Sequence, residues 1–180
     1  MNFTATPIPG AWFVELDRKA DERGYFARSW CRDEFAAHGL PDVMVQASIS
    51  HNTARGTLRG MHFQRAPSRE AKLVRCQAGR VVDVIVDLRP ESPAYCKHHA
   101  VELSAASGAA LYIPPGVAHG FQTLEPDSDV YYMMSDVHQP DLAAGVRHDD
   151  PAFGIRWPLP VAVIAPRDAE YPDFVPLRAH

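Results

Sequence analysis

The sequence predicts a mainly β domain, in which short strands form an antiparallel barrel or jelly roll that carries a few short helices. Strand-like stretches separated by glycine and proline run over about residues 46–134, and such spacing is typical of an all-β barrel or sandwich. In residues 80–88 the side chains alternate, with Asp83 and Asp87 on one face, which predicts a strand with one face in the core. Residues 77–79 end in a glycine and predict a tight hairpin turn before that strand.

The other elements follow from equally local patterns. Residues 32–38 are followed by Gly39 and predict a short helix with a glycine stop. The tail from Pro151 is rich in proline, so we expect it to wrap the barrel as loops with one short helix or turn. Further strands are expected at residues 72–76, 99–103, 109–113, 120–124 and 129–134.

Length and composition bound the function. The 180 residues fit a single domain, with a core barrel at about residues 45–135 and the C-terminal tail packed on it. A net charge of −4 provides no basic surface for nucleic acid or an anionic membrane, so a bound phosphate would be held by a few placed arginines. Three cysteines argue against a disulfide framework. Neither an export signal nor a long apolar run is present, and we expect a cytoplasmic protein.

Two stretches resemble the two histidine motifs of the cupins: residues 56–62 and residues 108–119. They end in His62 and His119, but the positions of the remaining metal ligands hold Gln64 and Lys72. An ammonium group repels a divalent cation, and metals require deprotonated donors. The sequence therefore predicts no metal site. The clustered ionisable groups favour acid/base chemistry over the alternative that both histidines are simply hydrogen-bonded in the interior.

Five stretches, in order along the chain, resemble the dTDP-4-dehydrorhamnose 3,5-epimerase family: residues 56–64, 71–75, 83–89, 113–121 and 150–158. The similarity runs from roughly Asp21 to Phe174. It implies a cupin without metal or cofactor, and a homodimer in which strands near the N-terminus are exchanged. It also implies a nucleotide-linked 4-keto-6-deoxy sugar as substrate, used in deoxysugar and polysaccharide biosynthesis.

The same resemblance assigns catalytic roles. His62 is the base that removes a proton next to the C4 ketone, and Asp168 is its partner carboxylate. The acid on the opposite face of the ring is Tyr132 or its neighbour Tyr131, and only one of them can enter the barrel because neighbouring strand residues face opposite sides. We favour Tyr132. Lys72 takes the place of the missing metal, since a fixed positive charge stabilises an enolate.

The resemblance further implies a substrate-binding set. Arg59 is expected to bind the diphosphate, because guanidinium groups match phosphate oxygens, and Arg23 of the neighbouring subunit is expected to assist. Gln46 is expected to contact the base, and His119 to hydrogen-bond the sugar. The complete set is Arg23, Phe26, Gln46, Ser48, Arg59, His119 and Arg167.

Departures from the family leave the specificity open. Arg28 stands where the family commonly has an acid, and Ser48 where it has an asparagine near the thymine, so another nucleotide is an alternative. After Tyr132 the tract at residues 133–135 also differs, which bears on whether C3 alone or both C3 and C5 are epimerised. A C3-specific epimerase, a keto-isomerase on another nucleotide sugar and a non-catalytic sugar-binding cupin remain alternatives. A metal-dependent dioxygenase is disfavoured by Gln64 and Lys72.

Overall fold

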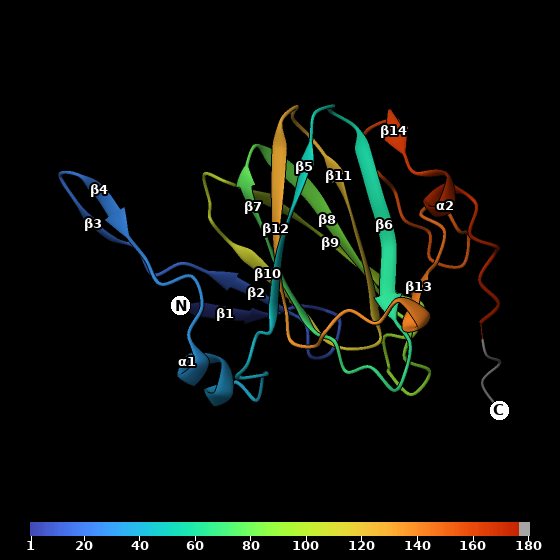
Figure 1. Cartoon of the computed structure of the whole chain (residues 1–180), viewed down its shortest axis with the longest axis horizontal. Coiled ribbons are helices and arrows are strands. Elements are labelled where there is room, and N and C mark those ends of the chain that lie inside the picture. Colours follow the sequence, from blue (N-terminus) through green and yellow to red (C-terminus); the bar gives the residue numbers. More distant parts are fainter. Residues whose placement is uncertain (177–180) are drawn as a thin grey trace.

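The computed structural model describes residues 1–176, which form two facing antiparallel sheets and a hairpin that projects to one side (Figure 1). The first sheet has the order β1 (Asn2–Ala5), β2 (Trp12–Glu15), β10 (Ala110–Ile113), β7 (Lys72–Ala78), β12 (Ser128–Met134), β5 (Gln46–Asn52). The second has the order β13 (Ala143–Gly145), β6 (Thr57–Gln64), β11 (Val117–Thr123), β8 (Arg80–Asp87), β9 (His98–Ser104), and β14 (Val163–Ile164) pairs with β6 in parallel. The mainly β prediction is confirmed.

The core lies between the two sheets, where inward-facing side chains from both meet. Val74 and Leu111 of the first sheet belong to the same buried cluster as Ile85 and Phe121 of the second. The predicted turn joins β7 to β8, with Gly79 at a φ of 70°. Positive φ is readily adopted only by glycine. The prediction of a hairpin there is wrong, because β7 and β8 belong to different sheets and the turn carries the chain from one sheet to the other.

The prediction that the strand at residues 80–88 buries only one face is wrong. Asp83 and Asp87 point inward and are buried, and Val84 and Val86 on the opposite face are buried as well. The reason is that Phe153 and the rest of the tail cover the outside of the second sheet. The strand predicted at residues 120–124 also begins earlier, at Val117, because residues 117–119 continue the pairing with β8.

The outer face of the first sheet is covered by the N-terminal part of the chain. Helix α1 (Arg32–Ala37) inserts Phe35 against Tyr112 of β10 and Phe3 of β1. The chain leaves the helix through Gly39, which has a φ of 69° and lies two residues beyond its end. The remaining helices are short: η1 (Pro140–Leu142) and α2 (Pro166–Ala169). Among the described residues no helix is long and apolar enough to cross a membrane.

Strands β3 (Lys19–Asp21) and β4 (Gly24–Phe26) pair only with each other and extend away from the barrel as an arm (Figure 1). Phe26 on this arm is 78% exposed. In contrast, β1 and β2 are paired into the first sheet of their own chain through β10. Of the N-terminal strands, the arm is therefore the part that the barrel of this chain leaves unpaired.

Candidate active site

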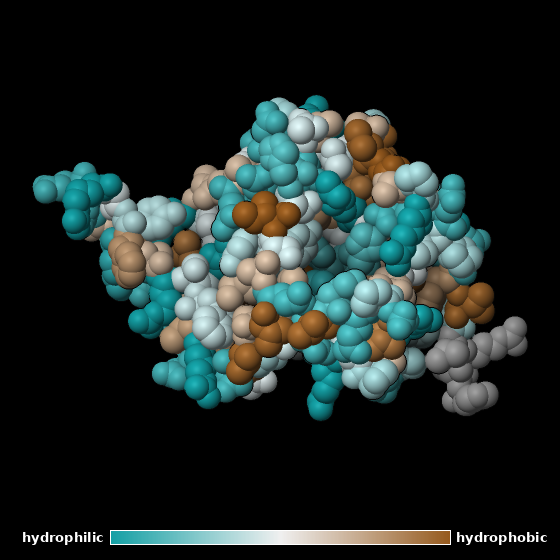
Figure 2. Space-filling view, in the orientation of Figure 1, coloured by the Kyte–Doolittle hydropathy of each residue, from teal (hydrophilic) through white to brown (hydrophobic). Residues whose placement is uncertain are grey.

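A cavity of about 480 Å³ opens between β5, β12 and β7 of the first sheet and β6 and β13 of the second. Figure 2 shows a largely hydrophilic recess in the face turned to the viewer. The residues that line the cavity are Gln46, Ser48, His62, Phe63, Gln64, Glu70, Lys72, Tyr132, Met134, His138, Ala143, Ala144 and Arg167. The fold thus places the expected base, acid and lysine around one space.

His62 and Asp168 form a hydrogen-bonded dyad, with His62 Nε2 lying 2.7 Å from Asp168 Oδ1. The other carboxylate oxygen accepts the backbone N–H of Gly60 at 3.0 Å. Burial of Asp168 disfavours its charged form, but these hydrogen bonds outweigh burial and lower the pKa of the carboxyl. An ionised carboxylate can only accept, so His62 Nε2 carries the proton. The other ring nitrogen, Nδ1, is left as a proton acceptor.

The glycines of β6 and β11 make this arrangement sterically feasible. Gly60 has a φ of 123°, and a Cβ placed on it would lie 2.5 Å from the Cα of Gly120. The two backbones therefore approach as only glycines permit. The register between the two strands shifts immediately after His119. This close approach sets the Gly60 N–H and the His62 ring on the same carboxylate of helix α2.

Tyr132 lines the cavity, whereas Tyr131 does not. Successive residues of β12 face opposite sides of the sheet, and Tyr131 lies opposite Arg75 on the outer face. Burial, and after it the negative charge of Asp83, raise the pKa of Tyr132. The hydroxyl therefore stays protonated at neutral pH and is able to donate a proton.

His119 occupies a different place from the one expected. It is 4% exposed and lies outside the set of cavity-lining residues. Its Nε2 lies 2.9 Å from Asp83 Oδ2, and its ring packs edge-on against Tyr132 with centroids 5.8 Å apart. The inward-facing Asp83 thus holds the histidine beside the tyrosine, and the hydrogen bond expected from His119 to the sugar stays a prediction. Asp83 was missed as a site residue, and the signal available in the sequence was that it shares a strand face with the apolar Val81 and Ile85.

Lys72 enters the cavity from the first residue of β7 and is paired there with Glu70. Gln64 Nε2 donates to the second oxygen of the same carboxylate at 2.8 Å. Sequence reasoning recognised Gln64 and Lys72 as replaced ligand positions but did not identify Glu70. The missed signal was an acid two residues from the lysine.

A second cavity of about 390 Å³ adjoins the first, because His62 and Arg167 line both. Arg59 also lines it and is held by the Asn52 side chain, with Nε 2.8 Å from Oδ1. The Nε of Arg167 donates to the hydroxyl of Tyr171 at 3.0 Å. Two guanidinium groups therefore border a space that begins at the dyad, which suits an anionic group attached to the reacting sugar.

Three predicted binding residues, Arg167 among them, line the first cavity, and two lie away from it. Gln46 and Ser48 of β5 are in its wall, and the Gln46 side-chain oxygen accepts the backbone N–H of His138 at 2.6 Å. Arg23 and Phe26 are on the projecting arm and line neither of the two cavities. The Arg23 side chain is 84% exposed and pairs with Asp21 of the same hairpin.

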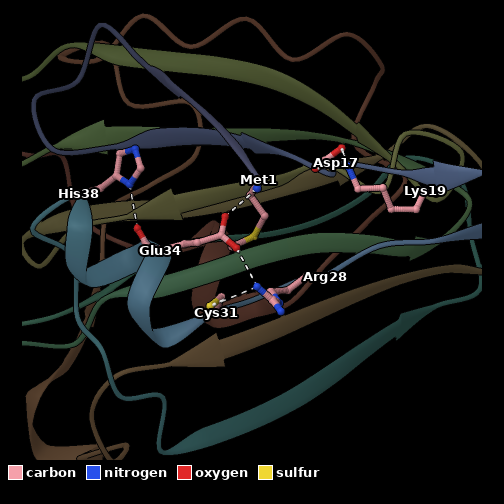
Figure 3. A network of polar contacts seen from close by, with 7 residues as sticks. All are labelled: Met1, Asp17, Lys19, Arg28, Cys31, Glu34 and His38. Carbon is pink, nitrogen blue, oxygen red and sulfur yellow. Dashed lines mark hydrogen bonds and ion pairs between the residues drawn. The ribbon is translucent and has the colours of Figure 1, made fainter.

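Arg28, at the base of the arm, is bound to helix α1. Its guanidinium lies 3.3 Å from a Glu34 carboxylate oxygen, and the other oxygen of Glu34 accepts the Met1 amino group at 2.7 Å (Figure 3). The Cys31 sulfur is a further contact of Arg28. These contacts hold the C-terminal end of the arm against helix α1 of its own chain.

Among residues 1–176 there is no group of three or more histidine, cysteine, aspartate or glutamate side chains placed to hold a metal ion. Gln64 and Lys72, which stand at ligand positions of the cupin motif, are both hydrogen-bonded to Glu70.

Comparison with known proteins identifies the family of the chain. The family model described as dTDP-4-dehydrorhamnose 3,5-epimerase matches residues 5–175. A dTDP-4-dehydrorhamnose 3,5-epimerase of Sinorhizobium fredii is 37% identical, over 98% of this chain and 91% of the relative. A dTDP-4-dehydrorhamnose 3-epimerase of Streptomyces niveus is also 37% identical, over 91% of this chain and 79% of the relative.

A solved structure extends the agreement to the fold. The crystal structure of dTDP-4-dehydrorhamnose 3,5-epimerase from Elizabethkingia anophelis superposes with a TM-score of 0.93 at 34% identity, covering 97% of this chain and 96% of that one. Sequence and fold agree over nearly the whole chain, and it belongs to the dTDP-4-dehydrorhamnose 3,5-epimerase family.

Proposed function

We propose that this chain is an epimerase of a nucleotide-linked 4-keto-6-deoxy sugar, of the dTDP-4-dehydrorhamnose 3,5-epimerase type. The observation that carries the proposal is the placement of the His62–Asp168 dyad, Lys72 and Tyr132 around one cavity. The C4 carbonyl of such a sugar acidifies the protons on C3 and C5. Removing one of them gives an enolate, and a proton returned from the opposite face inverts the carbon.

Each group has one task in this reaction. The Nδ1 of His62 takes the proton, because Asp168 fixes the tautomer that leaves this nitrogen free. The ammonium of Lys72 stabilises the negative charge that develops on the C4 oxygen. Tyr132 donates the new proton, and its raised pKa means that the phenol holds this proton at neutral pH.

The second cavity supplies a place for the diphosphate. Arg59 and Arg167 border it, and it meets the first cavity at His62. A diphosphate there would leave the attached sugar in the larger cavity beside the dyad, with Gln46 and Ser48 of β5 in the same wall. Arginine is suited to this role because it binds phosphate oxygens at two points.

A homodimer would complete the site. The arm carries Arg23 together with the exposed Tyr25 and Phe26, and none of them lines either cavity of its own chain. The edge strand β5 leaves Ile49 exposed. Burial of these apolar side chains against a second copy would be favourable, and would bring Arg23 and Phe26 to the neighbouring site.

An epimerase that acts at C3 alone is a second candidate. Met134 lines the cavity two residues beyond Tyr132, in the tract where the sequence departs from the usual family pattern. The relative from Streptomyces niveus is named a 3-epimerase. The reach of the acid decides which carbons are re-protonated from the far face, so a change beside Tyr132 bears on this choice.

The test is deuterium uptake from D₂O into dTDP-4-keto-6-deoxyglucose, followed by NMR. We expect wild type to exchange at both C3 and C5, and His62→Ala to lose at least about 100-fold in rate, as expected when a general base is removed. His99→Ala, which lies on β9 and lines neither cavity, is the matched control and should keep the wild-type rate.

The other outcomes separate the alternatives. Exchange at C3 alone would identify the single-position epimerase. Movement of the carbonyl would identify a keto-isomerase. If this substrate is inert, the same assay with UDP- and GDP-linked 4-keto-6-deoxy sugars tests the nucleotide. Binding without exchange of any of them would overturn the enzymatic proposal in favour of a sugar-binding protein.

A further inference from the structure

Glu70 is a carboxylate of the cavity wall to which the mechanism above gives no role. Its side chain is only 5% exposed, and it lies just before β7. One oxygen accepts Lys72 Nζ and the other accepts Gln64 Nε2 at 2.8 Å. All three side chains line the same cavity as His62 and Tyr132.

The hydrogen-bond directions in this group require an ionised carboxylate. The backbone N–H of Gln139 donates to Gln64 Oε1 at 3.0 Å, which leaves the Gln64 amide nitrogen facing Glu70. Lys72 has only donors. Both oxygens of Glu70 must therefore accept, and of the ordinary side chains of this size only a carboxylate accepts at both ends. A glutamine at position 70 would turn its own NH₂ toward a donor.

We propose that Glu70 is the positioning residue for Lys72, and that it holds the ammonium at a fixed place in the cavity where the enolate oxygen forms. This inference rests on the proposed function. Lysine has a flexible four-carbon stem, and a small misplacement of a catalytic group costs much of its effect. Gln64 and Gln139 fix the carboxylate, and the carboxylate in turn fixes the lysine.

The pairing also makes the buried charge tolerable. The Lys72 side chain is only 16% exposed, and an unpaired ammonium in such a place is costly. Glu70 itself is not a candidate for the acid or base, because both of its oxygens are already occupied. Its effect on catalysis should therefore pass entirely through Lys72.

The first experiment needs no activity. The chain has three lysines, Lys19, Lys72 and Lys97, so a protein with ¹⁵N-labelled lysine gives a simple ammonium spectrum. Held in a buried ion pair, the Lys72 ammonium should exchange its protons slowly and give a signal that Lys72→Met removes. We expect Glu70→Gln to abolish or markedly shift this signal and to leave any signals of the exposed Lys19 and Lys97 unchanged, and the circular dichroism spectrum verifies folding. An unchanged Lys72 signal would overturn the proposal.

The second experiment is a double-mutant cycle on deuterium exchange. Glu70→Gln should lower kcat by about 10-fold, with a change in KM of less than about 3-fold, since the lysine acts in the transition state. In the Lys72→Met background the same substitution should cost less than about 2-fold. Equal losses in both backgrounds would show that Glu70 acts independently of Lys72. The control is Glu91→Gln, an exposed carboxylate in the turn after β8.

The two experiments distinguish failure of this inference from failure of the proposed function. If wild type exchanges no deuterium into any nucleotide sugar, the proposed function fails. The ammonium spectra then decide by themselves whether Glu70 positions Lys72.

Discussion

The carboxylate of Asp168 binds the side chain of His62 and the backbone of the same strand at once. One oxygen lies 2.7 Å from His62 Nε2 and the other 3.0 Å from the Gly60 nitrogen. Asp168 is 106 residues from His62 in the chain and belongs to the short helix α2 of the tail. The proline-rich tail therefore does more than cover the barrel, because it supplies half of the dyad.

The first prediction concerns the stability of this dyad as a function of pH. The pKa of Asp168 is lowered in the folded protein, because the hydrogen bonds from His62 and Gly60 outweigh the effect of burial. A carboxyl of this kind contributes stability above its unfolded pKa, and loses it as the pH falls through the folded pKa. At pH 7 wild type should exceed Asp168→Asn by about 1 to 3 kcal/mol in the free energy of unfolding. The difference should shrink below about pH 4.

Urea unfolding at pH 7 and at about pH 2 measures this difference, since the low pH must lie below the lowered pKa of Asp168. Both proteins are kept at one concentration so that any assembly is held fixed. A gap of the same size at both pH values would mean that the Asp168 charge is not its source.

The second prediction tests the close approach of β6 and β11. A Cβ at position 60 would lie 2.5 Å from the Gly120 Cα and 2.8 Å from the His119 oxygen, at a φ of 123°. Gly60→Ala should therefore destabilise the fold by about 2 to 4 kcal/mol, and should reduce activity by shifting His62 from Asp168. Gly154→Ala is the matched control, since it has a positive φ but open space around the new Cβ, and it should cost about 1 kcal/mol. Equal melting temperatures for the two variants would refute the steric argument.

Much of the fold could be predicted because its signals are local. The alternation in residues 80–88, the Gly79 turn and the Gly39 stop each depend on a few neighbouring residues, and the structure has β8, a turn and α1 at these places. What could not be predicted is which outer faces are covered. Whether Val84 and Val86 are exposed depends on Phe153, which is far away in the sequence.

The residues of the candidate site also fall into those with a local sequence signal and those that depend on distant contacts. Motif spacing located His62 and Lys72. Strand alternation predicted that only one of Tyr131 and Tyr132 faces the interior, and in the structure Tyr132 lines the cavity. Contacts between strands were beyond the sequence. The pairing of His119 with Asp83 depends on the side-by-side packing of β11 and β8, and it removes His119 from the cavity wall.

The third prediction tests whether the arm completes the site of a second copy. Arg23 lines neither cavity of its own chain, whereas His62 lines both. If the proposed homodimer exchanges arms, His62→Ala and Arg23→Glu should each be inactive alone, because they damage different parts of one composite site. After unfolding and refolding as an equal mixture, half of the dimers are mixed, and each mixed dimer has one intact site. We therefore expect about one quarter of wild-type activity to return.

Refolding each variant separately is the control, and sedimentation verifies the dimer. No recovery in a mixture that does form dimers would place Arg23 and His62 in the same chain's site, or remove Arg23 from it.

The last prediction separates proton removal from inversion. His62 removes the proton and Tyr132, on another strand, returns one from the opposite face. In Tyr132→Phe the base can still exchange its proton with D₂O and return deuterium to the face it came from. Deuterium should therefore enter the substrate with retained configuration, while formation of the epimer falls by about 100-fold.

The control is Tyr131→Phe, which removes a hydroxyl on the outer face of the same strand, opposite Arg75, and should leave both rates near wild type. NMR gives deuterium content and configuration in one experiment. If Tyr132→Phe loses exchange and inversion to the same extent, the tyrosine is needed for proton removal itself. If only Tyr131→Phe loses inversion, the acid is Tyr131 and not Tyr132.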